Sequence, residues 1–530
     1  MTIRIPVDLA SADSVPDWQN CFRWPVPLVE AQDVTFSAFG RFLKAVETVD
    51  GDAAALACHT GRLTGELLLA LDSVKLVQSA REKGIELVGG PPAVSALLSA
   101  GPSDAAAFTK YSQLPQQLVK HVRLREAARA ASWSKGLKVI PALFNPKVTA
   151  FSHNALLRAE AEHAGFSVGF RHGFDLMERT AVQYEKSLTQ DIQRWKPAVD
   201  TVLALAAQVV SDAENLDPRL LVKARDLLVA VLEPLLWSSA QEIETARRIP
   251  NLPSDIWIAS AGQPKIRALS LEVRRRGGRV TGFEHAGCAG LMADNFSLLT
   301  SELIIEDEFC TSTPEIAGML SSNAAMAKFD AFRSTKIRAG RGDPTFAKKP
   351  TSQKRGRNGG KPNVLYVVGA FDGARRRVPP SLTDPVKMVW WRETADEIMK
   401  LPVNFKMQVH PGGSLPGKSN PLKSQVPTTD SRYEQAEEWA DVIVIDVTQS
   451  TTLTLSLCSD KHLVLIDYKR NVMYDGVLER AKRRASIVSV EYDERGVPRV
   501  DADGLRDAVL GDPVSLDGGE FRKLYAGEYA

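Results

Sequence analysis

A histidine directly follows an apolar stretch in "FKMQVHPGG", the segment at residues 405–413. His410 is followed by Pro411 and Gly412, and the whole chain contains only eight histidines. An imidazole can donate a hydrogen bond to an anion, and glycine lets the backbone come close to a ligand. The segment therefore indicates a ligand site where a strand ends, although a histidine before Pro-Gly is also an ordinary loop residue.

Three hydroxyl residues, Ser450, Thr451 and Thr452, stand where a helix should begin in "IDVTQSTTLTL". The free N–H groups of a first helical turn attract anions, although Ser or Thr there often serves only as an N-cap. A further strand in the same region ends on Asp467, in "LIDYKRN". Because ligands of open α/β sheets bind outside the carboxyl ends of the strands, His410 and this helix start together predict a clamp for a phosphate or diphosphate.

Two segments before residue 336 also contain reactive side chains. "FRHGFD" contains Arg171 and His172, and "FEHAG" contains Glu284, His285 and Gly287. A histidine or a carboxylate at a strand exit can act as a general base or a nucleophile. Glu284, His285 and His172 are therefore the candidate catalytic residues, and the guanidinium of Arg171 is suited to hold a carboxylate.

The elements that must position these residues alternate between strands and helices. After residue 361, the strand candidates "NVLYVV", "NFKMQV", "DVIVI" and "HLVLID" are separated by helical segments. These strands are apolar on both faces, as buried parallel strands must be. The pattern predicts an α/β protein whose C-terminal domain, residues 362–530, is doubly wound and Rossmann-like.

The first part of the chain, residues 1–335, shows similar alternation, with strand candidates such as "DIWI" and "RVTGF". We interpret it as a second Rossmann-like domain with a helical insertion at about residues 187–248. Residues 336–361 are basic, rich in Gly, Pro, Ser and Thr, and contain one acid, Asp343. This composition predicts a flexible linker between the two domains.

The combination of an HP motif and a later Ser/Thr pair resembles bacterial GT-B glycosyltransferases that use cytidine-nucleotide donors, such as sialyl- and Kdo-transferases. CDP-glycerol polymerases have a related layout. The resemblance implies that the HP histidine and the Ser/Thr residues bind the donor phosphates. These positions are His410, Pro411 and Gly412 in the first motif and Ser450, Thr451 and Thr452 in the second.

The "FEHAG" segment resembles the His-Gly loop of surface-carbohydrate biosynthesis transferases, which lies at the cleft between their two domains. His285 and Gly287 match that loop, whereas Glu284 replaces the usual Gln and Ala286 replaces a Gly. The resemblance implies a GT-B fold, with two Rossmann-like domains facing a cleft. The C-terminal domain would hold the nucleotide, and the N-terminal domain would present the acceptor.

The implied activity is transfer of a sugar from a CMP-activated donor to a surface glycan, such as a capsule polysaccharide, or to a lipid-linked or protein acceptor. Kdo or a nonulosonate, such as sialic, legionaminic or pseudaminic acid, is the expected sugar, and Arg171 would hold its carboxylate. GT-B enzymes generally stabilise the departing phosphate with hydrogen-bond donors, so we expect neither a metal nor a cofactor.

Three other functions stay open on the same residues. A CDP-polyol phosphotransferase would use the same phosphate clamp but break a phosphoryl bond. A nucleotide-sugar epimerase would act on the donor without an acceptor. A non-catalytic GT-B-like protein would bind a sugar or a partner, and the altered "EHAG" loop is the feature that favours it.

Composition limits the class of protein and its location. A chain of 530 residues suggests two or three domains, and a net charge of +2 gives no field that would favour nucleic acid. The five cysteines are scattered without a CxxC pair, which is typical of a reducing compartment. No signal-peptide pattern or long apolar run is present, so we expect a cytoplasmic protein. The basic linker leaves open a peripheral contact with the inner membrane.

Overall fold

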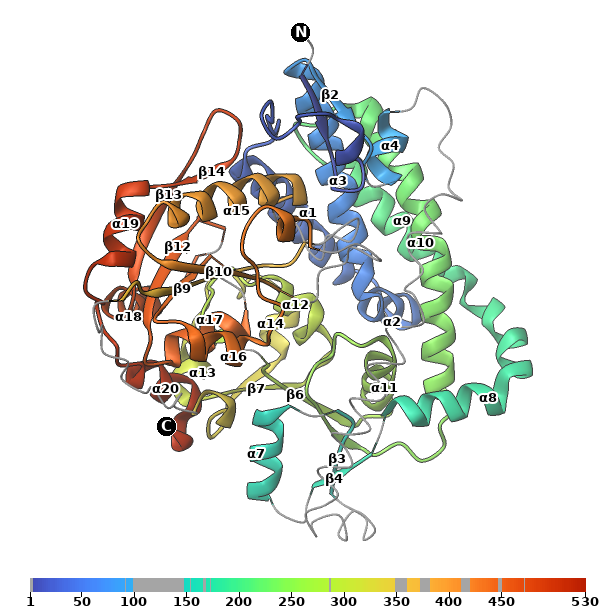
Figure 1. Cartoon of the computed structure of the whole chain (residues 1–530). Helices are drawn as coiled ribbons and strands as arrows, with labels where there is room; N and C mark the ends of the chain where they lie inside the picture. Colours follow the sequence, from blue (N-terminus) through green and yellow to red (C-terminus); the bar gives the residue numbers. More distant parts are fainter. Residues whose placement is uncertain are drawn as a thin grey trace.

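The computed structural model is a mixed α/β structure with parallel sheets (Figure 1). It describes residues 3–90, 92–98, 147–152, 154–164, 168–171, 173–285, 287–347, 360–371, 382–410, 420–446, 450–470 and 472–530. Two six-stranded sheets, here called the N-terminal and C-terminal sheets, are accompanied by a largely helical unit.

The C-terminal sheet has the strand order β10-β9-β11-β12-β13-β14, in which only β14 is antiparallel to its neighbour. Its strands are β9 (Asn363–Val368), β10 (Asn404–Val409), β11 (Val442–Ile445), β12 (His462–Asp467), β13 (Ser486–Tyr492) and β14 (Pro498–Val500). From β9 the chain moves to β10 at one edge of the sheet, and then it crosses back to β11 on the other side of β9. The order of winding therefore reverses between β9 and β11, and ligands of doubly wound folds bind at such a switch point.

Helices cover both faces of this sheet, which is why its strands are apolar throughout. They are α15 (Asp384–Met399), α16 (Tyr433–Trp439), α17 (Thr451–Cys458), α18 (Asp475–Arg484), α19 (Ala502–Leu510) and α20 (Gly519–Ala526), with the short η8 (Pro421–Ser424) and η9 (Gly527–Tyr529). Tyr366 of β9 lies in the same apolar cluster as Trp390 of α15. Its neighbour Leu365 lies in the cluster of Leu453 of α17, so α15 and α17 pack on opposite faces.

The N-terminal sheet is wholly parallel and has the order β4-β3-β5-β6-β7-β8. Its strands are β3 (Val148–Ala150), β4 (Val168–Phe170), β5 (Asp255–Ile258), β6 (Arg279–Phe283), β7 (Glu308–Thr311) and β8 (Lys336–Ala339). The accompanying helices are α7 (Ala155–Ala164), α11 (Pro264–Arg275), α12 (Ser297–Ser301), α13 (Pro314–Ser321) and α14 (Asp330–Ser334), with η5 (Cys288–Gly290), η6 (Leu303–Ile305) and η7 (Pro344–Phe346). Both sheets thus share one winding pattern.

The helical unit combines the start of the chain with the helices that precede β5. It contains β1 (Ile3–Pro6), η1 (Ala12–Ser14), α1 (Leu28–Val46), α2 (Gly51–His59), α3 (Gly61–Glu82), β2 (Ile85–Val88), α4 (Pro92–Leu98), α8 (Gly173–Asp191), η4 (Ile192–Trp195), α9 (Lys196–Ser211) and α10 (Pro218–Arg247). Figure 1 shows these helices, in blue and green, beside the C-terminal sheet in orange. Among the described helices, none combines the length and apolarity that a membrane crossing needs.

The structure corrects two features of the predicted domain plan. The start of the chain is mostly helical, with β1 and β2 forming only a small parallel pair, so alternation toward a large sheet begins at β3. The predicted helical insertion at residues 187–248 lies within a longer helical stretch that starts at Gly173. These helices pack on α1, α2 and α3 because their apolar faces share one core with them.

The predicted linker at residues 336–361 is wrong in its first part. Lys336–Ala339 pairs with β7 as the edge strand β8, and Asp343 is buried. Phe346 is also buried, against Tyr525 of α20, with ring centroids 5.4 Å apart. The basic and small residues of this segment suggested a linker. They are also compatible with the edge strand β8, because an edge strand tolerates exposed charge.

Segments that cross between the units fix the two sheets relative to each other. The backbone N–H of Asp343 donates to the carbonyl of Tyr525 at 2.9 Å, and the Thr313 hydroxyl donates to the carbonyl of Leu524 at 2.7 Å. On the other side, the amide of Gln32 in α1 donates to the carbonyl of Arg470 at 2.8 Å. The helical unit and the end of the chain therefore both bridge the sheets.

We expect Phe346→Ala to destabilise the protein by roughly 3–5 kcal/mol, because it empties a buried aromatic position. Urea unfolding would measure the loss. Lys336→Ala, at a side chain with 75% exposure, is the matched control and should change little. Equal stability of the Phe346 variant and the wild type would show that this segment behaves as a linker after all.

Candidate functional site

A cavity of about 750 Å³ lies where the carboxyl end of β6 meets those of β9, β10, β11 and β12. Its polar lining from the N-terminal side comprises Glu284, His285, Asn295, Ser297, Ser301 and Glu302. Its polar lining from the C-terminal side comprises Lys387, Gln408, His410, Ser431, Arg432, Tyr433, Glu434, Asp446, Ser450, Thr451, Thr452, Tyr468 and Arg470. The Lys and Arg side chains of the lining thus all belong to the C-terminal wall, whereas acidic side chains lie on both walls.

The structure brings together six residues that the sequence singled out. They are Glu284, His285, His410, Ser450, Thr451 and Thr452, and all line this cavity. His172, Pro411 and Gly412 lie outside the described residues. A separate hollow of about 690 Å³ between α1 and α9 contains none of the predicted site residues.

Three predicted residues do not line the cavity. Arg171 follows β4, an edge strand three positions from β6, which corresponds to roughly 14 Å across the sheet. Its exposed guanidinium donates to the carbonyl of Asn251 at 3.5 Å. Arg171 therefore does not lie beside the cavity, where it was expected to bind the carboxylate of the donor. Asp467 instead accepts the backbone N–H of Lys469 at 2.9 Å and shapes the turn after β12.

Gly287, the third of these residues, connects the loop after β6 to α17. Its φ of +70° lies in the left-handed region that favours glycine. A Cβ at this position would lie 2.8 Å from the Cγ2 atom of Thr454. Gly287 therefore lets the loop carrying His285 pack closely against the helix whose start lines the cavity.

The first turn of α17 has the geometry of an anion-binding site. Ser450 is the N-cap, and its Oγ accepts the backbone N–H of Leu453 at 3.1 Å. Within the described part of the chain, the N–H groups of Thr451 and Thr452 have no hydrogen-bond partner. Free N–H groups at a helix start, together with the positive end of the helix dipole, favour a bound phosphate.

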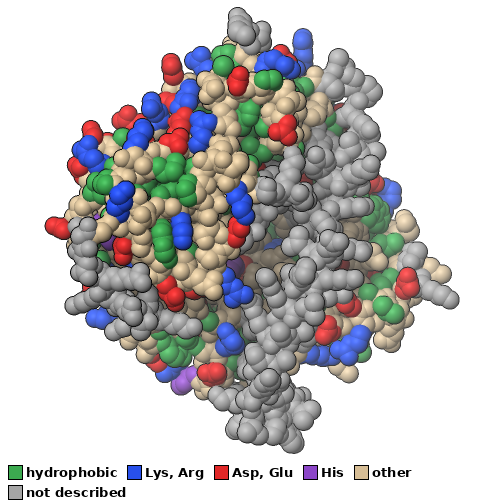
Figure 2. All heavy atoms as spheres, in the orientation of Figure 1, with side chains coloured by type: hydrophobic (Ala, Val, Ile, Leu, Met, Phe, Trp, Pro, Cys, Tyr) green, Lys and Arg blue, Asp and Glu red, His purple; other side chains and the backbone are tan. Residues whose placement is uncertain are grey.

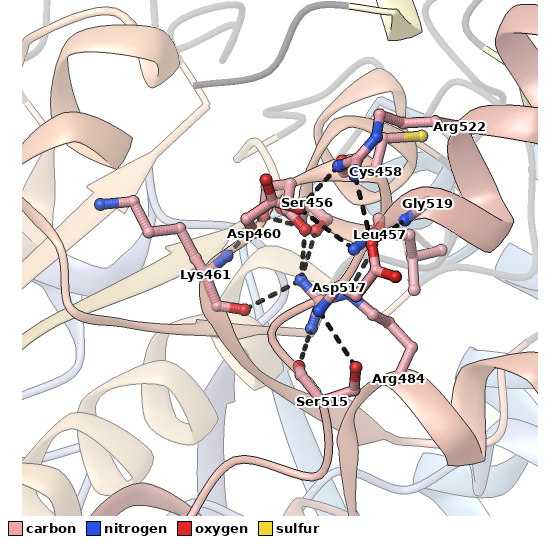
Figure 3. Close-up of polar contacts among 12 residues, drawn as sticks. Ser456, Leu457, Cys458, Asp460, Lys461, Arg484, Ser515, Asp517, Gly519 and Arg522 are labelled. Atoms are coloured by element: carbon pink, nitrogen blue, oxygen red, sulfur yellow. Dashed lines mark hydrogen bonds and ion pairs between the residues drawn. The ribbon is translucent and has the colours of Figure 1, made fainter. Parts of the chain in front are cut away.

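The opposite end of α17 is held by two buried arginines (Figure 3). The guanidinium of Arg484 donates to the carbonyls of Ser459 at 2.6 Å and Lys461 at 2.8 Å, and Arg522 donates to the carbonyl of Cys458 at 2.7 Å. Burial lowers the pKa of Arg484 to about 10, so it stays a cation at neutral pH. These cations satisfy carbonyls at the negative end of the helix and hold its first turn in place.

His410 and Glu284 are fixed by backbone contacts at their strand ends. The N–H of His410 donates to the carbonyl of Gly369, which follows the neighbouring strand β9, at 3.2 Å. The Glu284 carboxylate accepts the N–H of Ala289 at 3.0 Å and both the N–H and hydroxyl of Ser312 at 3.1 Å. Burial raises the pKa of Glu284 to about 7, against these hydrogen bonds, which favour the ionised form. Glu284 thus positions the loop that carries His285.

His285 is the better-placed candidate base, because its half-exposed side chain lines the cavity. Its Nδ1 lies 4.0 Å from Oε1 of Glu302, a buried carboxylate that also accepts the N–H of Ala261 at 2.7 Å. A carboxylate beside an imidazole orients the ring and stabilises its protonated form. The sequence reasoning did not single out Glu302, which stands in an ordinary-looking helical segment.

A second buried carboxyl group lies behind Glu302. Burial and the charge of Glu302 raise the pKa of Glu306 well above its usual range. A Cβ on Gly282 would lie 2.1 Å from the Glu306 carboxyl carbon, which explains the glycine in β6. Glu302 is the member of this buried pair that lies beside His285.

The sequence reasoning also missed the cavity residues of α15 and β11. Asp446 directly follows β11, and its Oδ2 accepts the Tyr366 hydroxyl at 2.8 Å. Its place after an apolar strand is the same signal that found His410, and it could have been noticed. Lys387 and Trp390 come from a helix interior and become recognisable only when α15 is packed on the sheet.

Comparison with known protein families finds no match for this chain, and no curated protein matches it significantly. The fold and the cavity therefore carry the functional argument. Among the described residues, no group of three or more His, Cys, Asp or Glu side chains is arranged to hold a metal ion. Metal-independent chemistry stays a prediction.

We expect Arg484→Met to lower the free energy of unfolding by roughly 3 kcal/mol, because several buried carbonyls lose their donor. Urea unfolding would measure this loss. Arg483→Ala is the matched control on the same helix, since that side chain is 59% exposed and pairs only at the surface with Glu520. An Arg484 variant as stable as the control would contradict the role assigned to this cation.

Burial raises the pKa of the Asp446 carboxyl to about 7 from 3.8. The folded protein therefore holds this proton more tightly than the unfolded chain, and stability falls as the pH rises from about 4 to about 7. Asp446→Asn should remove this part of the pH dependence. Urea unfolding measures the free energy of unfolding at about pH 5 and at about pH 8. The decrease in this free energy between the two pH values should be smaller for Asp446→Asn than for the wild type. The exposed Asp430→Asn is the control and should show the same decrease as the wild type.

Proposed function

We propose that this protein is a GT-B-like glycosyltransferase that takes a sugar from a CMP-activated donor and transfers it, without a metal, to a surface glycan or glycoconjugate. Kdo or a nonulosonate is the proposed sugar. The observation that carries the proposal is one cavity lined by the first turn of α17, by His410 and by His285, whose Nδ1 lies 4.0 Å from Glu302.

In this proposal the C-terminal wall binds the donor phosphate. The N–H groups of Thr451 and Thr452, which lack a partner in the described part of the chain, and the imidazole of His410 donate to its oxygens. Arg432 of the same lining adds a positive charge. When the glycosidic bond breaks, negative charge grows on the departing CMP. Preorganised donors that stabilise such charge lower the barrier without any rearrangement at the moment of reaction.

The N-terminal wall activates the acceptor in the same proposal. His285 accepts the proton of the acceptor hydroxyl while that oxygen bonds to the anomeric carbon, and Glu302 stabilises the imidazolium that forms. Glu284 is a poor nucleophile because three donors already occupy its carboxylate. This arrangement favours a single displacement, which inverts the configuration at the anomeric carbon.

The cationic side chains of the cavity lining also support an anionic donor. Acidic and basic side chains are interspersed over the described part of the C-terminal unit on the face shown in Figure 2, in keeping with a net charge of +2. The cations Arg432 and Arg470 line the cavity together with His410, and Glu434 is an acidic neighbour in the same lining. A phosphate with an adjacent carboxylate, as in CMP-Kdo or a CMP-nonulosonate, suits that wall.

Calorimetric titration of CMP, CDP and UDP tests this proposal. We expect the wild type to prefer cytidine nucleotides and His410→Ala to bind them about tenfold more weakly, since one charge-assisted hydrogen bond is lost. His163→Ala, on α7 and absent from the cavity lining, is the matched control.

The other outcomes separate the alternatives. A preference for UDP would keep the cavity but overturn the donor class and favour an epimerase. No nucleotide binding at all would favour a non-catalytic binding protein. Cytidine binding followed by release of a polyol phosphate, identified by product analysis, would favour the phosphotransferase.

A further inference from the structure

A recess on the α15 side of the cavity takes no part in the proposed phosphate clamp. It is lined by Lys387, Trp390 and Trp391 of α15, by Asp446 after β11 and by Tyr468 after β12. We call these five residues the α15 recess. Because α15 and α17 cover opposite faces of the C-terminal sheet, the recess and the anion site meet only at the carboxyl edge of the strands.

Trp390 lines this recess and has an indole N–H without a hydrogen-bond partner among the described residues. The side chain is only 2% exposed and packs against Tyr468, with ring centroids 4.9 Å apart. Among the described residues, nothing accepts its Nε1–H. A buried donor without an acceptor costs free energy, and at the edge of a cavity a ligand oxygen could supply the missing acceptor.

The charges of the recess favour hydroxyl groups over anions. Lys387 Nζ donates to the carbonyl of Ala370 at 3.0 Å and lies 3.4 Å from Oδ1 of Asp384. Asp446 is a second acidic group in the same region and is buried, so two carboxyl groups flank one ammonium. A ligand carboxylate or phosphate would meet these acids, whereas a hydroxyl can donate to Asp446 and accept from Trp390.

The position of the recess relates it to the clamp and to the candidate base. Asp446 ends β11, and Ser450 begins the next helix four residues later. The recess lies beside β9 and β11, where the winding of the sheet reverses and ligands bind in doubly wound folds. A cavity of about 750 Å³ has room for much more than a phosphate.

We infer that the α15 recess binds the hydroxyl-bearing part of the transferred sugar, with Asp446 accepting from and Trp390 donating to its hydroxyls. The inference rests on the proposed function, because it assumes that a nucleotide phosphate occupies the start of α17. The carboxylate of a nonulosonate would stay near the phosphate at the cationic wall, and its polyhydroxylated remainder would enter the recess.

Calorimetry with a sugar nucleotide and its parent nucleotide tests the inference. The probes are CMP and the 3-fluoro analogue of CMP-N-acetylneuraminate, which resists cleavage, together with CDP and CDP-glycerol. We expect the wild type to bind at least one glycosyl- or polyol-bearing probe about tenfold more tightly than its parent nucleotide. Trp390→Phe, which keeps the ring and removes the N–H, and Asp446→Asn should each lose most of that advantage.

The controls distinguish this inference from the phosphate clamp. Trp439→Phe changes a tryptophan of α16 outside the cavity lining and should keep the advantage. His410→Ala should weaken parent nucleotide and sugar nucleotide alike. Changes in the Trp390 fluorescence, obtained as wild type minus Trp390→Phe, should follow the sugar nucleotide and not CMP.

Two results would overturn the inference. If the parent nucleotides bind as proposed but no probe exceeds its parent, or if the recess variants keep the full advantage, the recess is only a structural part of the core and the proposed function survives. If no nucleotide binds, the proposed function fails at the same time, and the recess inference fails with it.

Discussion

The unpaired backbone N–H groups at the start of α17 are the interaction on which the candidate site depends. Ser450 caps the helix and leaves the N–H groups of Thr451 and Thr452 without partners in the described part of the chain. Arg484 and Arg522 bind carbonyls at the other end of the helix and so help to fix the position of this anion site. The arginines therefore influence the site from the far end of α17 through the position of the helix.

A phosphate site alone does not make a transferase, and the second requirement is the opposing wall. Gly287 brings the loop after β6 close to α17, and Glu284 ties that loop to Ser312. Segments from both ends of the chain bridge the sheets, and His285 and His410 line the same cavity. The C-terminal wall of the cavity can thus stabilise the negative charge of a leaving group, and the N-terminal wall can accept a proton.

The sequence predicted most of the sheet strands and part of the site, for reasons that differ. Strands such as Asn363–Val368 were recognisable because they are apolar on both faces, and His410 because it ends such a strand. Arg171 was misplaced because alternation does not reveal strand order. Glu302 and Trp390 depend on packing between distant segments, and residues 336–347 have the composition of a linker although Phe346 is buried.

A crystal structure of the protein with CMP would test the central claim most directly. The account predicts that the CMP phosphate lies within hydrogen-bond distance of the backbone N–H groups of Thr451 and Thr452 and of the His410 imidazole, with the α15 recess left free for a sugar. A phosphate bound elsewhere, or a nucleotide outside this cavity, would contradict the account.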